Sequence, residues 1–300
     1  MARTQLPRVA VVTDSTAHIP GPVAEAAGVT VVPVHVISGD RTYREDVDID
    51  GPTVARLLRS GQSMSTSRPA PAEFAETYER LAHEGYAAVV SIHLSGSLSG
   101  TLEGAQLAAR AAPIPVRVVD TRTVAMAAGF GVLDAAAAAA AGADVDTCVR
   151  AAETTAQQSR LFFCLDTLEF LQKGGRIGTA SRYLGQALRI KPLLQIADGR
   201  VEALEKVRTS NRALRRLAEV AIDSASDWPR VRVAVHELDA VDAAGTVVGY
   251  LRQSGSPEPM MCGLGAVLGV HTGPGLVAVA VAPEAPGLDA GEVAPGSAAP

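Results

Sequence analysis

The stretch AAVVSIHLSGSLSGT at residues 87–101 decides the expected fold of the first half of the chain. Its first seven residues are mostly apolar and rich in β-branched side chains, so they predict a buried strand. The serines and glycines of residues 94–100 predict a turn, and a helix is expected over 101–112. A strand that runs through such a turn into a helix is typical of a parallel sheet flanked by helices.

The same alternation recurs on both sides of this stretch. Strands are expected at 9–12, 29–36 and 116–119, and helices at 53–60, 72–84, 124–141 and 146–158. With 300 residues, 47% of them hydrophobic, the chain is long enough to form two packed cores. Residues 1–159 therefore predict an α/β domain of three layers around a parallel sheet.

The second half of the chain has a different pattern. Strands at 193–197 and 201–204 flank Asp198-Gly199, a two-residue turn that joins antiparallel strands. Further strands are expected at 161–165, 231–235 and 276–281, and helices at 211–223 and 239–252. Residues 160–282 thus predict a second α/β domain with a mixed sheet. Residues 283–300 are mostly Ala, Pro and Gly and are expected to form a disordered tail.

The charge pattern argues against a nucleic-acid partner. The net charge is −5, and the 27 Lys and Arg residues are scattered, whereas phosphate backbones require a concentrated basic face. One local exception lies at the start of the helix expected over 211–223, where four arginines cluster: Arg208, Arg212, Arg215 and Arg216. This cluster is read either as a basic patch or as an ordinary solvated helix face.

The spacing of the cysteines and the lack of a long apolar segment argue against further classes of protein. The three cysteines, Cys148, Cys164 and Cys262, are far apart and have no spacing typical of a disulfide framework or a zinc site. No apolar segment of about 20 residues is present, so no membrane span is expected. We therefore expect a cytoplasmic protein without a bound metal.

Two clusters of hydroxyl groups precede expected helices. Ser95 and its neighbours lie before the helix at 101–112, and Ser65-Thr66-Ser67 lies before the helix at 72–84. Helix N-termini attract anions, and ligands of open α/β sheets gather at the carboxyl ends of the strands. The two clusters could converge on one carboxylate, although simple capping of the helices is the competing interpretation.

A third polar segment is His271-Thr272-Gly273-Pro274-Gly275, expected as a turn before the last strand. His271 could bond a ligand or orient a serine, so a serine hydrolase or acyltransferase that uses Ser95 and His271 stays open as an alternative. A nucleophile elbow is absent because Leu98 occupies the position between Ser97 and Ser99. No glycine-rich turn is followed by the Lys-Ser or Lys-Thr of an ATP-binding loop.

Seven motifs in register resemble the DegV family over residues 8–282. They are VVTDST (11–16), TSRP (66–69), LSG with SGT (94–101), LQKGGRI (171–177), KP (191–192), EKVRT (205–209) and HTGPG (271–275). The resemblance implies two α/β domains that bury one long-chain fatty acid. It also implies a protein without catalytic residues that serves as the lipid-carrying partner of a fatty acid kinase, whose catalytic subunit is separate.

The resemblance also assigns roles to individual residues. It implies that Thr66, Ser95 and Gly96 bind the fatty-acid carboxylate, with His271 close to them, and that the bound fatty acid is the ligand in place of a cofactor. Arg176 and Arg208 match basic residues that serve kinase engagement or phosphoryl transfer in the family. Arg68 departs from the family, which often has Gln or another polar residue there. A lipid-responsive adaptor without phosphoryl transfer stays open as a further alternative.

Overall fold

A parallel sheet forms the centre of the first half of the chain. The computed structural model describes residues 8–184 and 191–284, so nearly all of the predicted disordered tail lies outside the described residues. The sheet has the order β2-β1-β6-β7, and all neighbouring strands are parallel. Its strands are β1 (Val9–Asp14), β2 (Val29–Val32), β6 (Ala88–His93) and β7 (Val116–Asp120). The predicted parallel sheet is confirmed.

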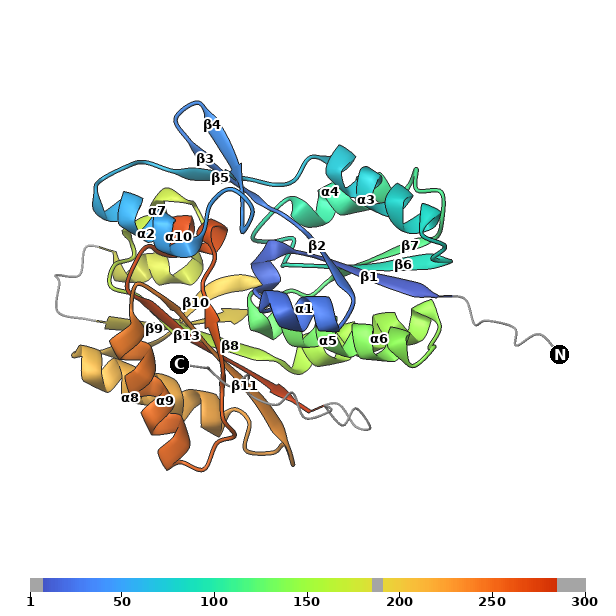
Figure 1. Cartoon of the computed structure of the whole chain (residues 1–300). Coiled ribbons are helices and arrows are strands. Elements are labelled where there is room, and N and C mark those ends of the chain that lie inside the picture. The colour runs from blue at the N-terminus through green and yellow to red at the C-terminus, as the bar shows by residue number, and fades with distance from the viewer. Residues whose placement is uncertain (1–7, 185–190, 285–300) are drawn as a thin grey trace, which may run out of the picture.

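Helices cover both faces of this sheet (Figure 1). On one face lie α3 (Pro71–His83) and α4 (Thr101–Ala109), and on the other lie α5 (Met126–Ala140) and α6 (Val145–Gln158). The small residues of α5, mostly Ala and Gly, allow it to pack closely against α6 and β1. The short elements η1 (Ser15–Ala17) and α1 (Gly21–Ala26) follow β1.

The second half contains a mixed sheet, as predicted, and it has six strands in place of the five that were expected. Its order is β10-β9-β8-β13-β11-β12, and every pair is antiparallel except β11 with β12. The strands are β8 (Arg160–Cys164), β9 (Lys191–Ala197), β10 (Arg200–Val207), β11 (Val231–Leu238), β12 (Met260–Gly263) and β13 (Leu276–Pro283). Asp198 and Gly199 join β9 to β10 with φ of 47° and 76°, the positive values that a tight hairpin turn requires.

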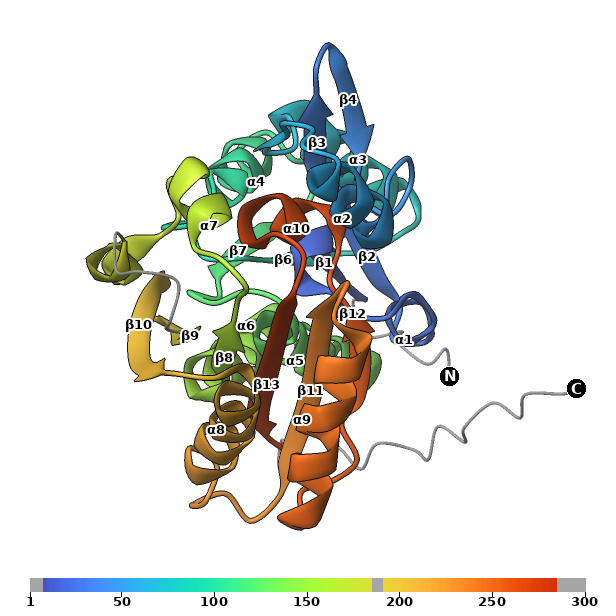
Figure 2. The ribbon, with the colours of Figure 1, turned by 90° about the vertical axis from the view of Figure 1, so that its left-hand side faces the viewer.

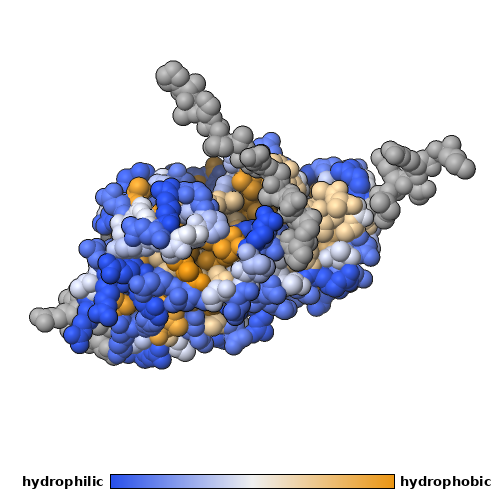
Figure 3. All heavy atoms as spheres, turned by 90° about the horizontal axis from the view of Figure 1, so that it is seen from below, coloured by the Kyte–Doolittle hydropathy of each residue, from blue (hydrophilic) through white to orange (hydrophobic). Residues whose placement is uncertain are grey.

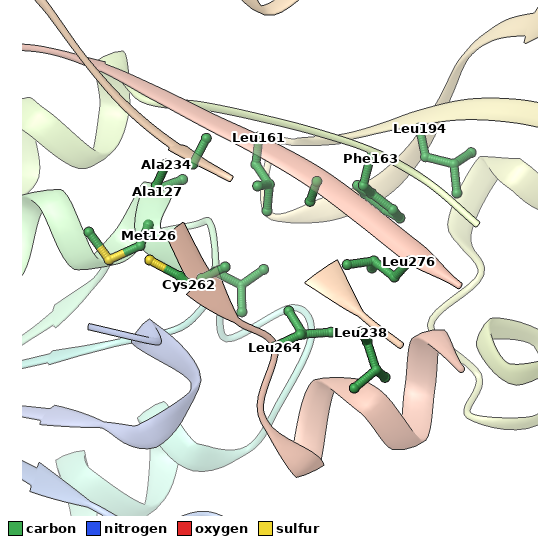
Figure 4. Close-up of a cluster of buried hydrophobic side chains, with 14 of the residues drawn as sticks. Met126, Ala127, Leu161, Phe163, Leu194, Ala234, Leu238, Cys262, Leu264 and Leu276 are labelled. Carbon is green, nitrogen blue, oxygen red and sulfur yellow. The ribbon is translucent and has the colours of Figure 1, made fainter. Parts of the chain in front are cut away.

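The two large sheets share a layer of helices. α8 (Ser210–Asp223) and α9 (Val241–Gln253) cover the outer face of the mixed sheet, as Figure 2 shows. On its inner face, β13 contacts α5 and α6, which also pack on the parallel sheet. One buried cluster therefore runs from Met126 of the first half to Leu161 and Leu276 of the second (Figure 4). The domain boundary after residue 159 stays a prediction.

The structure differs from the prediction near residue 33 and contains a strand near residue 66 that was not predicted. The single strand expected over 29–36 is divided, because Pro33 has no N–H to donate and the chain leaves the parallel sheet there. A separate antiparallel sheet follows, made of β3 (His35–Ser38), β4 (Arg41–Arg44) and β5 (Ser65–Ser67), in the order β4-β3-β5. Residues 65–67, described from the sequence only as a hydroxyl cluster before a helix, thus form a strand, and Thr66 pairs with Val36.

The segment that carries His271 also differs from the prediction. His271 and Thr272, expected as part of a turn, are instead the last two residues of a helix, α10 (Ala266–Thr272). α10 packs against β3, β5, α2 (Gly51–Arg59) and α7 (Glu169–Lys173), and η2 (Gly178–Tyr183) follows α7. This packing faces His271 toward β5, the strand that holds Thr66.

One face of the protein is mainly hydrophilic (Figure 3), and its three cysteines are buried. None of the helices in the described ranges has both the length and the apolar character needed to cross a membrane. Hydrophilic residues predominate on the face in Figure 3, where apolar residues gather toward the middle. Cys148, Cys164 and Cys262 are buried free thiols, and burial raises the pKa of Cys164 and Cys262 to about 12.

Candidate functional site

A cavity of about 290 Å³ lies against the inner face of the mixed sheet. This volume is near the lower end of the range for small-molecule sites. The wall is mainly apolar: Leu161 and Phe163 come from β8, Leu276 from β13, and Leu264 from the loop before α10. Figure 4 shows Leu161, Phe163 and Leu276 projecting from their strands toward Leu264. The cavity therefore suits an apolar ligand.

Polar side chains are gathered at one part of this wall. Thr66 and His271 are partly buried, whereas Arg68 and Arg176 are exposed. The exposed arginines mark where the cavity opens to solvent. A long apolar ligand with one polar end would match this division, because its chain meets the apolar wall and its polar end meets the hydroxyl, imidazole and guanidinium groups.

Thr66 and His271 form a direct hydrogen bond across 205 positions of sequence. The Thr66 Oγ1 and His271 Nε2 atoms are 2.8 Å apart. Burial, and then the charge of Arg176, lower the pKa of His271 to about 4, so the imidazole is neutral near pH 7. With the proton on Nε2, His271 donates to Thr66 and leaves the Thr66 hydroxyl hydrogen free to donate to a ligand oxygen. The pair then acts as a donor suited to a carboxylate.

Gly174 and Arg176, the first and last residues of the GGR motif, lie beside the Thr66–His271 pair. A Cβ atom at Gly174 would come within 2.3 Å of His271 Nδ1, so only glycine allows this close approach. Nδ1 is buried and has no hydrogen-bond partner among the described residues. Arg176 donates through Nε to the Leu98 carbonyl at 3.0 Å and through Nη1 to the Gly174 carbonyl at 2.6 Å. These bonds hold the Ser/Gly turn next to α7.

Glu45, which was not among the predicted site residues, fixes the position of α10. Its buried carboxyl accepts hydrogen bonds from the Ser15 hydroxyl and, at 2.7 Å, from the Val267 N–H in the first turn of α10. Burial raises the pKa of Glu45 to about 7 despite these bonds. The contact links the end of β1 to the helix that carries His271.

A second buried network supports the cavity from the parallel sheet. His93 Nδ1 bonds Asp14 at 2.9 Å, and its Nε2 bonds Ser91 at 2.7 Å, which in turn accepts from Tyr78. Burial alone would raise the pKa of Asp14, but hydrogen bonds from His93, Thr16 and the Leu94 N–H outweigh it and lower the pKa. Asp14 also accepts a hydrogen bond from the Thr16 N–H at the end of β1.

Ser95 and Gly96 lie apart from the cavity wall in the structure. The buried Ser95 hydroxyl donates to the Gly199 carbonyl at 2.8 Å, and the Gly96 N–H points to Asp120. A Cβ atom at Gly199 would lie 2.4 Å from the Ser95 oxygen, so glycine is required there for the contact as well as for the turn. Ser99, from the same loop, lines the cavity in place of Ser95.

This placement bears on the alternative of a serine enzyme. The Ser95 hydroxyl is bonded to a backbone carbonyl, and the His271 Nε2 is bonded to Thr66. A serine nucleophile requires its hydroxyl to lie within hydrogen-bond reach of the base that activates it. The two residues are therefore not arranged as a nucleophile and its base.

The remaining arginines differ in their surroundings. Arg68 turns toward α4, where Nη1 pairs with Glu103 at 2.6 Å, so its charge is balanced at the edge of the cavity. Arg208 is exposed just after β10, outside the wall of the cavity. It forms no hydrogen bond or ion pair with any residue in the described ranges. Arg176 and Arg208 thus occupy separate positions.

The chain is similar to proteins of one family along almost its whole length. Residues 8–284 match the family model described as "Uncharacterised protein, DegV family". A DegV domain-containing protein of Streptomyces coelicolor is 49% identical over 275 residues, which cover 91% of this chain and 98% of that protein.

Solved structures of two proteins that bind fatty acids are also similar. One is the structure of a DegV family protein from Thermus thermophilus that describes its fatty acid binding. It matches with a TM-score of 0.87 and 34% identity, and the match covers 92% of this chain and 100% of that protein. DegV of Bacillus subtilis, a fatty acid binding protein, has a TM-score of 0.83 and 30% identity, with coverage of 93% and 100%.

Proposed function

The chain belongs to the DegV family, and from this premise we propose that it binds one long-chain fatty acid and presents the carboxylate to a fatty acid kinase. The observation that carries the proposal is an apolar cavity with a neutral Thr66–His271 donor pair on its wall. In this proposal the chain itself performs no chemistry. The catalytic subunit of the kinase is a separate protein.

The apolar wall would supply most of the affinity. Burial of about fourteen methylenes at roughly 0.8 kcal/mol each contributes on the order of 11 kcal/mol before the cost of ordering the chain. Leu161, Phe163 and Leu276 would contact the alkyl chain. Tight binding therefore does not depend on a strong ion pair at the carboxylate.

The head group would be held by neutral donors. Thr66 is the first donor, because its hydroxyl hydrogen is free when His271 donates to its oxygen. Ser95 is a second donor only if its hydroxyl leaves the Gly199 carbonyl, and Gly96 would take part through its N–H. Neutral donors suit a carboxylate that must react, since a bidentate arginine would occupy both of its oxygens.

The proposed reaction takes place at the carboxylate oxygen. That oxygen attacks the γ-phosphorus of ATP held by the kinase, the bond from phosphorus to the bridging oxygen breaks, and acyl phosphate and ADP result. Arg176 beside the cavity would stabilise the transferred group, and the exposed Arg208 would contact the kinase. The proposal includes a cytoplasmic location, where ATP is available.

Bound lipid is the first test. Protein purified from a bacterial host is expected to release close to one fatty acid per chain on denaturation, measured by mass spectrometry against an internal standard. Delipidated protein is expected to take up added palmitate to the same ratio. A preparation that contains no fatty acid and does not take up palmitate would overturn the proposal.

Phosphoryl transfer is the second test. Palmitate-loaded protein, ATP, Mg²⁺ and a fatty acid kinase catalytic subunit are combined, and acyl phosphate is trapped as the hydroxamate. Arg208→Ala is expected to bind palmitate normally but to form acyl phosphate more slowly, whereas Arg150→Ala on α6 serves as the control. Lipid-dependent binding to the kinase without any hydroxamate would favour the adaptor instead.

A further inference from the structure

A second groove adjoins the cavity at its polar end. It encloses about 340 Å³ and is lined by parts of the Ser/Gly turn, the loop after α7 and the start of β10. Ser99, Gly100 and Arg176 belong to the walls of both the groove and the acyl cavity. The groove is therefore continuous with the place where the head group of a bound fatty acid would lie.

Among the described residues, the charged side chains that line this groove are all positive. Arg176 and Arg200 line it, and within the described ranges no acidic side chain is part of its wall. The carboxylate of Asp120, which contacts Gly96 from outside this wall, accepts from the N–H groups of Gly96 and Arg122. Two guanidinium groups without a carboxylate between them favour a ligand that carries more negative charge than a carboxylate.

Arg176 and Arg200 have N–H groups that are not used in hydrogen bonds to other described residues. Arg176 uses Nε and Nη1 for backbone carbonyls, and its Nη2 bonds no other described residue. Arg200 is exposed, and its side chain forms no hydrogen bond or ion pair with the rest of the described chain. The exposed Ser97 adds a hydroxyl to the same wall. Guanidinium groups bind phosphate through paired N–H donors, so the groove offers the groups that a phosphoryl ligand requires.

We propose that this groove is the phosphoryl subsite of the protein, in which Arg200 and Arg176 bind the phosphate of an acyl phosphate while its chain stays in the cavity. The inference rests on the proposed function, because it takes the acyl chain as the ligand of the cavity. It adds Arg200 as the residue that distinguishes a phosphorylated head group from a carboxylate.

The test compares two probes on delipidated protein by calorimetric titration. Hexadecylphosphonate, a stable molecule with a phosphoryl-type head, is expected to bind about tenfold more tightly than palmitate, as one added charge-assisted hydrogen bond implies. Arg200→Gln is expected to remove this preference while palmitate affinity stays within about twofold. Arg212→Gln, on α8, is the matched control and is expected to keep the preference.

The outcomes separate the two proposals. Failure of the wild-type protein to bind palmitate would overturn the proposed function. Normal palmitate binding with equal affinity for both probes, or a preference that survives Arg200→Gln, would overturn the phosphoryl subsite alone. Displacement of hexadecylphosphonate by inorganic phosphate at the same concentration would also overturn it, because the site would then recognise free phosphate and not a group carried on an acyl chain.

Discussion

Two histidines in this molecule differ both in how deeply they are buried and in how many of their ring nitrogens are hydrogen-bonded. His93, in the parallel sheet, is fully buried and uses both ring nitrogens, one for Asp14 and one for Ser91. His271, on the wall of the cavity, uses one nitrogen for Thr66 and leaves the other without a described partner. The first is part of a closed network, whereas the second belongs to a pair with a donor left over.

This difference separates residues that hold the fold from residues that are available to a ligand. A buried polar group with all its bonds made stabilises one conformation, and removal of its partner leaves a costly unpaired group. A pair at a cavity wall with an unused donor can bind a ligand without breaking a bond of the protein. The following predictions change one side of the comparison at a time.

The largest effect is expected from the same substitution at the two histidines. His93→Gln leaves the buried Asp14 without the hydrogen bond from the imidazole ring. The free energy of unfolding of this variant should be lower than that of wild type by roughly 3–5 kcal/mol. His271→Gln should lower that free energy by about 1 kcal/mol, because it loses a single partly buried bond. Urea denaturation followed by circular dichroism measures both. Equal losses at the two positions would remove the distinction.

The pH dependence of stability should sharpen the same contrast. The pKa of His271 is about 4 in the folded protein and 6.5 as its ordinary value, so the unfolded chain binds more protons between these limits. Folding stability is therefore lost as pH falls from 6.5 toward 4, because the folded protein disfavours protonated His271, and the difference in pKa limits the loss to about 3 kcal/mol.

Denaturation of wild type and His271→Gln at several pH values isolates this loss. All other buried titratable groups, His18 and His236 among them, are present in both proteins, so their contributions cancel in the difference. The stability advantage of wild type, about 1 kcal/mol at pH 7, should shrink as pH falls and then reverse. An advantage that is the same at pH 7 and near pH 4 would contradict a depressed pKa at His271.

The Thr66 hydroxyl should affect binding more than folding. Thr66→Val keeps the shape of the side chain but removes the donor, so palmitate affinity should fall about tenfold, the value of one hydrogen bond. Thr246→Val on the exposed side of α9 is the control and should bind as wild type does. Unchanged affinity in Thr66→Val would show that the head group lies elsewhere.

The smallest effect is expected at Arg68. Its pair with Glu103 is largely exposed, with side-chain exposures of 48% and 76%, so solvent screens the interaction. Arg68→Gln should change the free energy of unfolding by less than about 0.5 kcal/mol. Palmitate affinity should change by less than about twofold, because the Arg68 charge is already balanced. A large loss of affinity would mean that Arg68 contacts the carboxylate directly.

The sequence predicted the two large sheets well, because their strands are strongly apolar and separated by clear turn and helix signals. Long-range pairing was less predictable. Pro33 divides an apolar run that reads as one strand, and Ser65–Ser67 reads only as a hydroxyl cluster before a helix until β3 supplies the partner that makes it a strand. No local pattern shows that these residues meet.

The site was predictable in part for the same reason. Thr66, His271 and Arg176 were named as candidates, and all three line the cavity. Ser95 and Ser99 lie in the same Ser/Gly turn and look alike in the sequence. Only the hydrogen bond from the Ser95 hydroxyl to the Gly199 carbonyl distinguishes them. Glu45 lies in an acidic run that reads as a solvated surface, and its burial follows from packing with Ser15 and Val267.

The central claim is that the cavity on the mixed sheet holds the alkyl chain, and blocking that cavity tests it most directly. Ala278 is buried on β13 and lines the cavity, so Ala278→Leu fills part of the space. Equilibrium dialysis of delipidated protein with radiolabelled palmitate should give one palmitate per wild-type chain and at least about tenfold weaker binding in a folded Ala278→Leu variant. Wild type that binds no palmitate, or a variant that binds it equally well, would contradict the account.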